Sequence, residues 1–357
     1  MKRQFRDRDF IETKENMLFC VIGNIHPKNR VISYLKYIPW KNIRAARLGW
    51  KRNQIEYGRI LPYYSAQGVL QVQQYLKNNF PKYVYFDPYL NIEIIGIPHE
   101  DIKEHYKPEE RIKEILKKPK DPLEEKVKEM ITTISKESNT STNFFGITGS
   151  ILIKIHSPNF SDIDITIYGL QNSLRVKEAL KKLLTEHREF RRLNKEEIEK
   201  HAKNISRIHD LSFKETLKLI NERWNIGKFK ETFFSIHPVK LEEEVKEKHE
   251  DKTYKPKGII KIKCKVIDST QALFYPCKYL VNEVKIIEGP KVNTIREVVS
   301  YEGIFCDIAK PTEEIIVKGK LEEVYNKKKN EKYHRVQVGS FEAKGKNYIK
   351  PVRWFKN

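Results

Sequence analysis

Cysteine is scarce in this sequence: the 357 residues contain four, and no two of them form a CxxC pair or a zinc-ligand spacing with histidine. A disulfide-rich scaffold is therefore excluded, and a reducing cytoplasm is the simplest setting. No apolar run approaches the ~20 residues that span a membrane, and the N-terminal MKRQFRDRDF is charged where a signal peptide has an apolar core. Glycine and proline number only 15 and 16, which excludes a collagen-like or low-complexity chain. We expect a folded cytoplasmic protein with no membrane partner.

Positive charge, in contrast, is abundant. Lysine and arginine number 69 against 48 acidic residues, which gives a formal net charge of +21. Such a charge creates a long-range field that attracts polyanions and nucleoside triphosphates. A lysine-rich solvated surface, as in many heat-adapted proteins, is the alternative explanation. Nucleic acid is the partner that the charge favours.

The length predicts two or three domains, because a domain typically holds ~100–200 residues. Residues 17–24 and 31–38 are rich in β-branched and aromatic side chains around a turn-forming HPKNR, which predicts a hairpin. Apolar spacing predicts a helix over 67–80, with two further strands after it. The charged segment 109–122 ends in two prolines and places a domain boundary near residue 119. Residues 1–119 are therefore expected to form an N-terminal domain of mixed α and β structure.

The next segment, 120–250, is expected to be a second domain of helices and strands. Apolar residues recur at helical spacing in two places, and a Ser-x-x-Glu capping box opens a third helix. The expected elements are helices over 122–136 and 174–184, a helix that begins after Ser212, and a strand over 232–239.

Short alternating or apolar segments predict a mainly β domain over 251–357, either a sandwich or a small barrel. The lysine-rich NKKKNEK is expected at the tip of a hairpin. The fold class predicted for the whole chain is α+β.

One stretch carries the chemistry: GITGSILIKIHSPNFSDIDITIYG, residues 146–169. Side chains in a strand alternate between its faces, so Asp162, Asp164 and Thr166 point one way and the intervening isoleucines point the other. Two carboxylates on one face repel each other unless a cation lies between them or one of them is protonated. Hard oxygen ligands of this kind suit Mg²⁺. The sequence therefore predicts a metal site at Asp162 and Asp164.

A short turn containing Gly146, Gly149 and Ser150 precedes the acidic pair. Glycine lets a phosphate approach the backbone closely, and free amide groups together with a serine hydroxyl can hold its oxygens. Eleven residues separate Ser150 from Asp162. An anion site and a cation site are thus close enough along the chain to serve one nucleotide.

The turn and the acidic pair form one motif: Gly149-Ser150, eleven intervening residues and Asp162-Ile163-Asp164-Ile165, with an expected helix on each side. This motif resembles the signature of the polymerase-beta-like nucleotidyltransferases. The resemblance covers about residues 120–240 and implies a mixed β-sheet with flanking helices. It also implies that Gly149 and Ser150 grip the triphosphate of the substrate, while Asp162 and Asp164 bind Mg²⁺ or Mn²⁺. The layout is similar as well to archaeal proteins known only as predicted nucleotidyltransferases.

The superfamily usually adds a third carboxylate from a later strand, which helps to deprotonate the acceptor hydroxyl. The strand over 232–239 has no acid on the relevant face and presents Ser235 and His237 instead. We name His237 as a catalytic candidate, either as metal ligand or as base, because its unperturbed pKa lies near neutrality. A purely structural histidine is the alternative, and Asp268 is an acidic substitute at the end of a strand.

Further binding residues are expected around this centre. Lys154 follows the turn and is a candidate for contact with the triphosphate. The segment PWKNIRAARLGWKRN interleaves cations with tryptophans, which suits RNA or single-stranded DNA; an ordinary basic helix with inward-facing tryptophans is the alternative. The nucleic-acid-binding candidates are Trp40, Arg44, Arg47, Trp50, Lys51 and Arg52.

The sequence thus favours a Mg²⁺-dependent nucleotidyltransferase that moves a nucleotidyl group from a nucleoside triphosphate to an acceptor. A nucleic-acid end, above all of RNA, is the acceptor that the charge favours. A protein hydroxyl or a small molecule remains an open alternative. The rival class is a nucleic-acid-binding protein that kept the fold and lost the activity.

Overall fold

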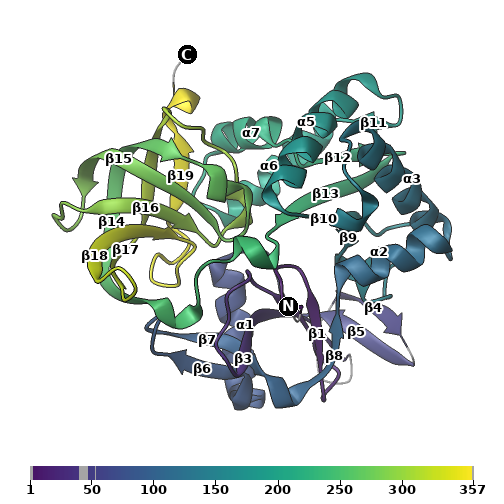
Figure 1. Ribbon diagram of the computed structural model, residues 1–357, viewed down its shortest axis with the longest axis horizontal. Helices are drawn as coiled ribbons and strands as arrows, with labels where there is room; N and C mark the ends of the chain where they lie inside the picture. The colour runs from purple at the N-terminus through teal and green to yellow at the C-terminus, as the bar shows by residue number, and fades with distance from the viewer. Residues whose placement is uncertain (1–2, 40–46, 53, 356–357) are drawn as a thin grey trace.

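Three β-sheets organise the computed structural model, which describes residues 3–39, 47–52 and 54–355. Figure 1 shows the N-terminal strands at the bottom, the central sheet with its helices at the upper right and the C-terminal strands at the left. Each sheet has a hydrophobic core of its own. The expected α+β class is confirmed.

The N-terminal sheet has eight strands in the described residues, with the order β4-β5-β3-β2-β1-β8 and with β7 joining β3 to β6. Helix α1 (Ala66–Asn79) packs against this sheet, and Ser65 caps its first turn. The expected hairpin and helix are confirmed. The strands are β1 (Phe10–Thr13), β2 (Leu18–Val21), β3 (Arg30–Pro39), β4 (Arg47–Arg52), β5 (Ile55–Arg59), β6 (Val84–Asp87), β7 (Ile92–Pro98) and β8 (Ile102–Tyr106).

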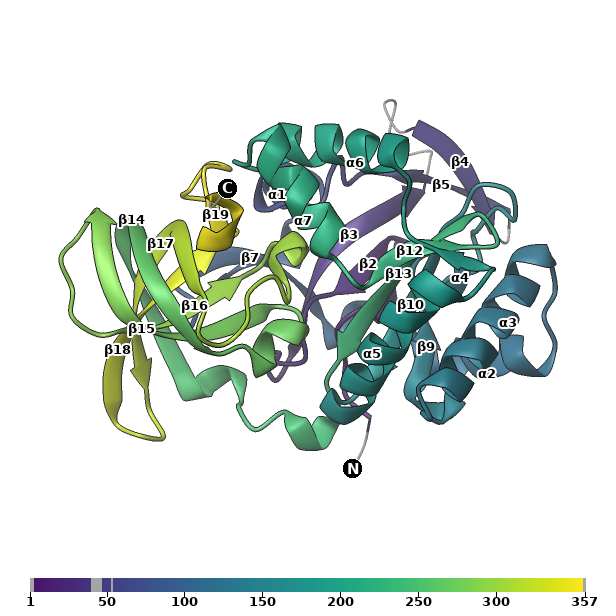
Figure 2. The same cartoon turned by 90° about the horizontal axis from the view of Figure 1, so that it is seen from above.

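The central sheet has five strands in the order β11-β12-β13-β10-β9. It is mixed, because β10 and β13 run parallel while the other pairs are antiparallel. Helix α5 (Leu170–Glu186) lies across β10 and β13, and α3 (Pro122–Glu137) packs on α5, as Figure 2 shows from above. The strands are β9 (Phe145–Ile147), β10 (Ile163–Tyr168), β11 (Phe190–Arg191), β12 (Ile226–Phe229) and β13 (Thr232–Val239).

Helix α2 (Pro108–Lys117) belongs to the central core by its packing. Ile112 and Ile115 are buried in the same cluster as α3 and the central sheet. The sequence-based boundary near residue 119 falls just beyond this helix. In the opposite direction, Leu152 and Ile153, which end and follow the one-turn helix α4 (Gly149–Leu152), are buried in the N-terminal core. The N-terminal and central parts therefore share the turn that begins at Gly149.

The C-terminal strands form a closed barrel, which decides between the two expected alternatives. Strand β14 pairs with both β15 and β17, so the order β14-β15-β16-β18-β17 closes on itself, and β19 extends it beyond β17. The lysine-rich turn lies at the tip of the β17–β18 hairpin, as expected. The strands are β14 (Lys252–Asp268), β15 (Cys277–Glu288), β16 (Ile295–Ser300), β17 (Glu314–Asn326), β18 (Glu331–Val338) and β19 (Tyr348–Pro351).

Helices α6 (Lys195–Ile208) and α7 (Phe213–Glu222) join the central sheet to the barrel. Each begins with a capping box, Asn194 with Glu197 and Ser212 with Glu215. Their apolar faces pack into the barrel core. The α7 cap was predicted, whereas α6 was not. None of the described helices has both the length and the apolar character that crossing a bilayer requires.

Candidate active site

A cavity of about 1510 Å³ lies where the three sheets meet. Residues from the N-terminal sheet, the central sheet and the barrel all line it. Those that bear on its chemistry are Lys36, Arg59, Tyr64, Gly149, Ser150, Asp162, Asp164, Ser235, His237 and Tyr275. The structure thus brings Gly149 and Ser150, the acidic pair and His237 together in one place. Gly146, which was expected in the same turn, lies in strand β9 and does not line the cavity.

Strand β10 positions the acidic pair as its alternation predicted. Ile163, Ile165 and Ile167 are fully buried in the central core. Asp164 emerges from the opposite face into the cavity. Asp162 comes just before the strand, which begins at Ile163 rather than at the first aspartate. The isoleucines therefore anchor the strand and leave both carboxylates at its open end.

Gly149 lies directly against Asp164. A Cβ atom at position 149 would be 2.6 Å from Asp164 Oδ2, closer than nonbonded atoms approach, and the glycine has a φ of +67°. The amide of Thr148 donates a 2.8 Å hydrogen bond to the carbonyl of Asp164 and fixes the spacing of the two segments. Only glycine fits this backbone conformation and this gap without strain.

Ser235 links Asp164 to His237. Parallel pairing of β10 with β13 sets Asp164 beside Ser235, whose Oγ lies 2.5 Å from Asp164 Oδ1 and 2.8 Å from His237 Nε2. An ionised carboxylate only accepts hydrogen bonds, so the serine hydroxyl donates to Asp164 and His237 Nε2–H donates to the serine. The imidazole thereby holds the serine, and the serine holds one oxygen of Asp164.

The two carboxylates have different electrostatic surroundings. The enclosing protein and the neighbouring Asp164 raise the pKa of Asp162 to about 6, although its side chain is open to the cavity. Burial alone would raise the pKa of Asp164, but His237, Lys36 and the Ser235 hydroxyl lower it below its usual range. Burial and the charge of Arg8 lower the pKa of His237 to about 4, so this imidazole is neutral at pH 7.

The donor set fits a divalent cation. Within the described residues, no hydrogen bond or ion pair holds the carboxylate of Asp162, and an unpaired carboxylate beside a second one is stabilised by a cation. Asp162 and Asp164 would supply the hard oxygen ligands that Mg²⁺ and Mn²⁺ prefer, and a substrate phosphate and water would complete the coordination.

A protein named uncharacterized protein MJ1086, from Methanocaldococcus jannaschii, is 31% identical to the chain over 359 aligned residues. The alignment covers 98% of this chain and 99% of the archaeal protein. The chain belongs to the family of this protein. No family model matches the sequence, and no solved structure matches it either. Because the alignment spans both chains almost completely, the likeness to MJ1086 includes all three parts of the fold.

Two of the residues predicted for the metal and triphosphate site lie away from the cavity. Lys154 follows α4 and forms a 3.0 Å ion pair with Glu114 on α2, with about half of its side chain in solvent. Asp268 ends β14, where its Oδ1 accepts a 2.7 Å hydrogen bond from the amide of Thr270. Neither is among the residues that line the cavity. The structure therefore does not bring them to the acidic pair.

The basic segment is a strand where it is described, so the alternative of a basic helix is wrong for residues 47–52. Trp50 lines the cavity and packs edge-on against Tyr37, with ring centroids 5.2 Å apart. Lys51 is exposed and pairs with Glu56 at 2.8 Å. Arg52 is held by Glu12 and by the hydroxyl of Tyr106. Trp40 and Arg44 lie outside the described residues, as does the side chain of Arg47.

The sequence did not point to the cations that face the acidic pair. Lys36 and Arg59 lie more than 100 residues before the aspartates, on strands β3 and β5 of a different sheet. Arg8 also lines the cavity and pairs with Asp7 at 3.3 Å. No local motif marks these residues, because only the packing of the N-terminal sheet against the central sheet brings them to the cavity.

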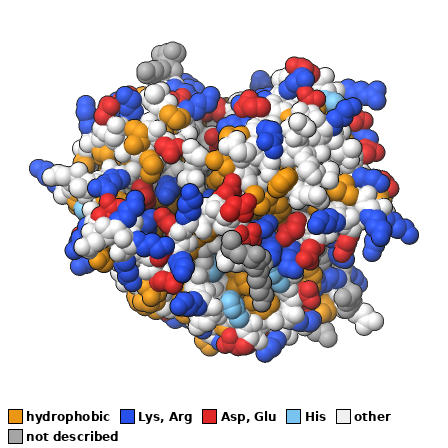
Figure 3. Space-filling model, in the orientation of Figure 1, with side chains coloured by type: hydrophobic (Ala, Val, Ile, Leu, Met, Phe, Trp, Pro, Cys, Tyr) orange, Lys and Arg blue, Asp and Glu red, His pale blue; other side chains and the backbone are white. Residues whose placement is uncertain are grey.

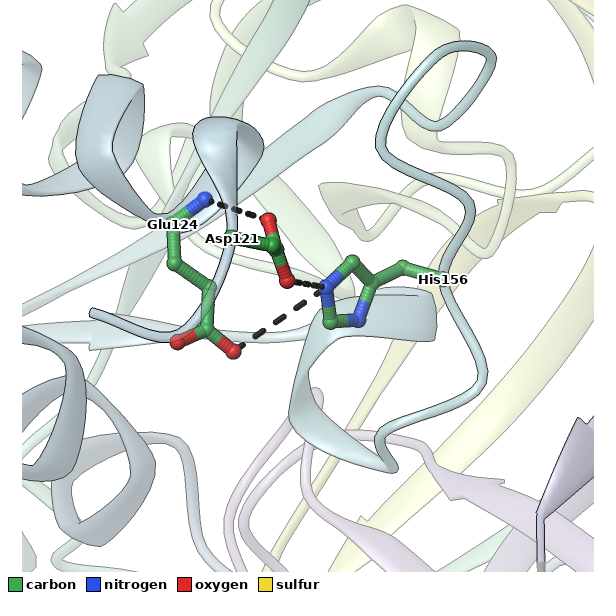
Figure 4. Close-up of side chains that lie close together, drawn as sticks. All are labelled: Asp121, Glu124 and His156. Carbon is green, nitrogen blue, oxygen red and sulfur yellow. Dashed lines mark hydrogen bonds and ion pairs between the residues drawn. The ribbon is translucent and has the colours of Figure 1, made fainter.

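A second carboxylate–histidine group lies at the start of α3 (Figure 4). Asp121 Oδ1 caps the helix by accepting the amides of Leu123 and Glu124, and its Oδ2 lies 2.8 Å from His156 Nε2. The Glu124 carboxylate is bound to the guanidinium of Arg111. The protein itself therefore satisfies both acids, and the cluster is explained as a helix cap with a buried ion pair.

Positive and negative charges are interspersed on the face of the molecule that Figure 3 draws. Figure 3 shows lysine and arginine side chains spread over the visible face, with acidic side chains between them. Many of the lysines and arginines form ion pairs, as Lys82 does with both Glu15 and Asp101. Surface cations of this kind contribute a general field. Specific contacts with an anion are expected instead from Lys36 and Arg59, which line the cavity and form no ion pair among the described residues.

Proposed function

We propose that the chain is a Mg²⁺-dependent nucleotidyltransferase, with a polymerase-beta-like central domain, that transfers a nucleotidyl group from a nucleoside triphosphate to an acceptor. A nucleic-acid end is the acceptor that we favour. The observation that carries the proposal is the contact between Gly149 and Asp164. The bare backbone of a Gly-Ser turn lies against a carboxylate, and the neighbouring carboxylate of Asp162 has no partner among the residues that the structure describes.

This contact explains why the turn and the acids occur together. A phosphate held by the backbone and hydroxyl of Gly149 and Ser150 would lie next to the carboxylate of Asp164. Phosphate and carboxylate repel each other unless a cation lies between them. A divalent ion bound by Asp162 and Asp164 would supply that charge and neutralise the phosphates. The arrangement therefore suits a metal-bound triphosphate better than a free anion.

Transfer would proceed by in-line displacement at the α-phosphorus. The acceptor hydroxyl oxygen forms a bond to the α-phosphorus, the bond from phosphorus to the bridging oxygen of the β-phosphate breaks, and pyrophosphate leaves. Asp162, whose side chain is open to the cavity, would receive the hydroxyl proton. His237 and Ser235 would hold Asp164 in place.

The proposal is tested by incubating the protein with a labelled nucleoside triphosphate, Mg²⁺ or Mn²⁺, and pooled RNA. We expect the wild-type protein to incorporate label into RNA, and Asp162→Asn and Asp164→Asn to reduce incorporation at least 100-fold. Asp268→Asn, outside the cavity, is the matched control and should retain activity.

The same assay decides among the alternatives. Label on a protein would identify a protein acceptor. An inert wild-type protein that binds RNA with a steep salt dependence would replace the enzyme with a nucleic-acid-binding module.

A further inference from the structure

The cavity has a second wall, on the N-terminal sheet, that faces the acidic pair. We call this wall the cationic wall. It consists of Lys36 on β3, Arg59 at the end of β5 and Tyr64 in the loop before α1. Both Asp162 and Asp164 experience the charge of Lys36, and Asp162 also experiences that of Arg59. The wall and the acidic pair line the same cavity, so a ligand held at the wall would lie within the space that contains the proposed reaction centre.

The two cations of this wall lack the partners that other cations of the sheet have. Lys36 is only 7% exposed, yet its ammonium forms no ion pair and donates no hydrogen bond in the described part of the chain. Its neighbours are the rings of Phe10, Tyr37 and Tyr64, each 5.5 Å away. Arg59 Nε is buried without a hydrogen-bond partner. In contrast, Arg52 and Lys103 on the same sheet both pair with Glu12. A buried cation is costly unless it is paired. The aspartates act on Lys36 only through space, so an anion in direct contact with it would have to come from outside the described chain.

Tyr64 adds a flat aromatic surface to these cations. Its side chain is 49% exposed, and it lies in the cavity. The Arg59 guanidinium lies 4.8 Å from the centre of the Tyr64 ring, and Lys36 Nζ lies 5.5 Å from it. Tyr34 contacts the same ring edge-on, with centroids 6.2 Å apart, and limits its movement. An exposed ring beside a guanidinium is the combination on which unpaired nucleobases stack.

The volume of the cavity leaves room for a second substrate. Small-molecule sites typically measure ~300–1,000 Å³, whereas this cavity measures about 1510 Å³. The Gly-Ser turn lies on the central side, and the cationic wall lies on the N-terminal side. The segment after the turn is buried in the N-terminal core, which ties the two walls together. A triphosphate at the turn and a terminal nucleotide at the cationic wall would meet at Asp162 and Asp164.

We propose that the cationic wall binds the hydroxyl-bearing end of a single-stranded nucleic acid, with Lys36 and Arg59 on its terminal backbone phosphate and Tyr64 stacked on its last base. This inference rests on the proposed function for its reaction, but the binding itself is independent of turnover. It assigns the acceptor to the N-terminal sheet and the nucleotide to the central sheet.

Binding of a fluorescent single-stranded RNA oligonucleotide, measured by anisotropy without triphosphate or metal, tests the inference. Lys36→Met, which keeps the length of the side chain, and Arg59→Ala should each raise the dissociation constant about tenfold and reduce the salt slope by about 0.7. Tyr64→Ala should raise the dissociation constant about 5- to 100-fold and leave the salt slope unchanged. Lys77→Ala and Phe86→Ala are controls on the same domain, since the Lys77 ammonium pairs with Glu93 and Phe86 is an exposed aromatic outside the cavity.

Oligonucleotide binding tests the inference, whereas incorporation of label tests the proposed function, so the failure of one can be distinguished from the failure of the other. If the three wall variants bind the oligonucleotide as the wild type does, the inference is overturned, whatever the activity. If they instead raise only the KM for the triphosphate, the wall binds nucleotide and the inference is also overturned. Tighter binding of blunt duplex than of single strand would contradict the assignment as well. Wall-dependent binding by a protein that never incorporates label supports the inference and refutes the enzyme.

Discussion

The backbone of Gly149 touches the carboxylate of Asp164: a Cβ atom at position 149 would lie 2.6 Å from Asp164 Oδ2. Gly149→Ala should therefore displace the carboxylate, and we expect at least a 100-fold loss of metal-dependent activity and a weaker affinity for Mn²⁺. The positive φ adds about 1 kcal/mol of strain. Activity assays and thermal unfolding measure the two effects.

Gly258→Ala separates the strain from the displacement. Gly258 also has a positive φ, +99°, but the nearest atom to an added Cβ is 3.9 Å away. Its alanine variant should lose similar stability and keep full activity. Equal activity of the two variants would refute the role of the Gly149 contact.

Ser235 and His237 should act as one unit. Ser235→Ala removes a hydrogen bond to a charged carboxylate, an interaction of about 1.5–3 kcal/mol, so we expect roughly a tenfold or greater rise in the apparent Mn²⁺ constant. His237→Ala should cause a smaller rise, because it acts through the serine. The double variant should be no worse than Ser235→Ala alone. Ser206→Ala on α6 is the control. If the effects of Ser235→Ala and His237→Ala on the Mn²⁺ constant add up in the double variant, the two residues do not act through one series of hydrogen bonds.

Asp162→Asn should stabilise the metal-free protein near pH 7.5. The pKa of Asp162 in the folded protein is raised to about 6, above its ordinary value, so the ionised carboxylate costs stability as the pH rises through 6. Water in the cavity screens part of this cost, and we expect a gain in Tm on the order of 1–2 °C. The gain should shrink as the pH falls from 6 and vanish below the ordinary pKa of 3.8, where the carboxyl is protonated in both the folded and the unfolded state. A variant that melts below the wild type at pH 7.5 would show that Asp162 supports the fold instead.

The cap at the start of α3 should be structural. Asp121→Ala should lower the free energy of unfolding by about 1 kcal/mol, whereas Asp121→Asn, which still caps a helix, should cost little. Neither variant should alter the dependence of activity on Mn²⁺, because Asp121 and Glu124 are already bound by backbone amides and Arg111. A shifted Mn²⁺ dependence in Asp121→Asn would identify the cluster as a metal site.

Local signals in the sequence predicted much of the fold. The period of the isoleucines in β10, the Ser212 cap and the turn before β3 depend on neighbouring residues, and each was found where expected. The cap of α6 was readable too, since Asn194 precedes Glu197 by three residues, but the helix has a weakly apolar sequence and was missed. The strand β4 was not predicted, because its pairing with β5 decides its structure.

The candidate site was predictable only in part, because some of its residues come together through contacts between distant segments of the chain. Gly149, Ser150, Asp162 and Asp164 lie on one short stretch whose spacing carries the signal. Lys36 reaches the same cavity through the packing of two sheets, which no sequence period encodes. The sequence showed Ser235 and His237, and no acid, on one face of the strand over 232–239. The hydrogen bond from Ser235 to Asp164, in contrast, depends on the parallel register of β10 and β13.

The metal and nucleotide site proposed at Asp162 and Asp164 can be tested with a crystal structure of the protein soaked with Mn²⁺ and a non-hydrolysable nucleoside triphosphate. Anomalous scattering locates the metal without any assumption about activity. We expect a manganese peak between Asp162 and Asp164, with the triphosphate against Gly149 and Ser150. A cavity without manganese, or a peak at Asp121, Glu124 and His156 alone, would contradict it.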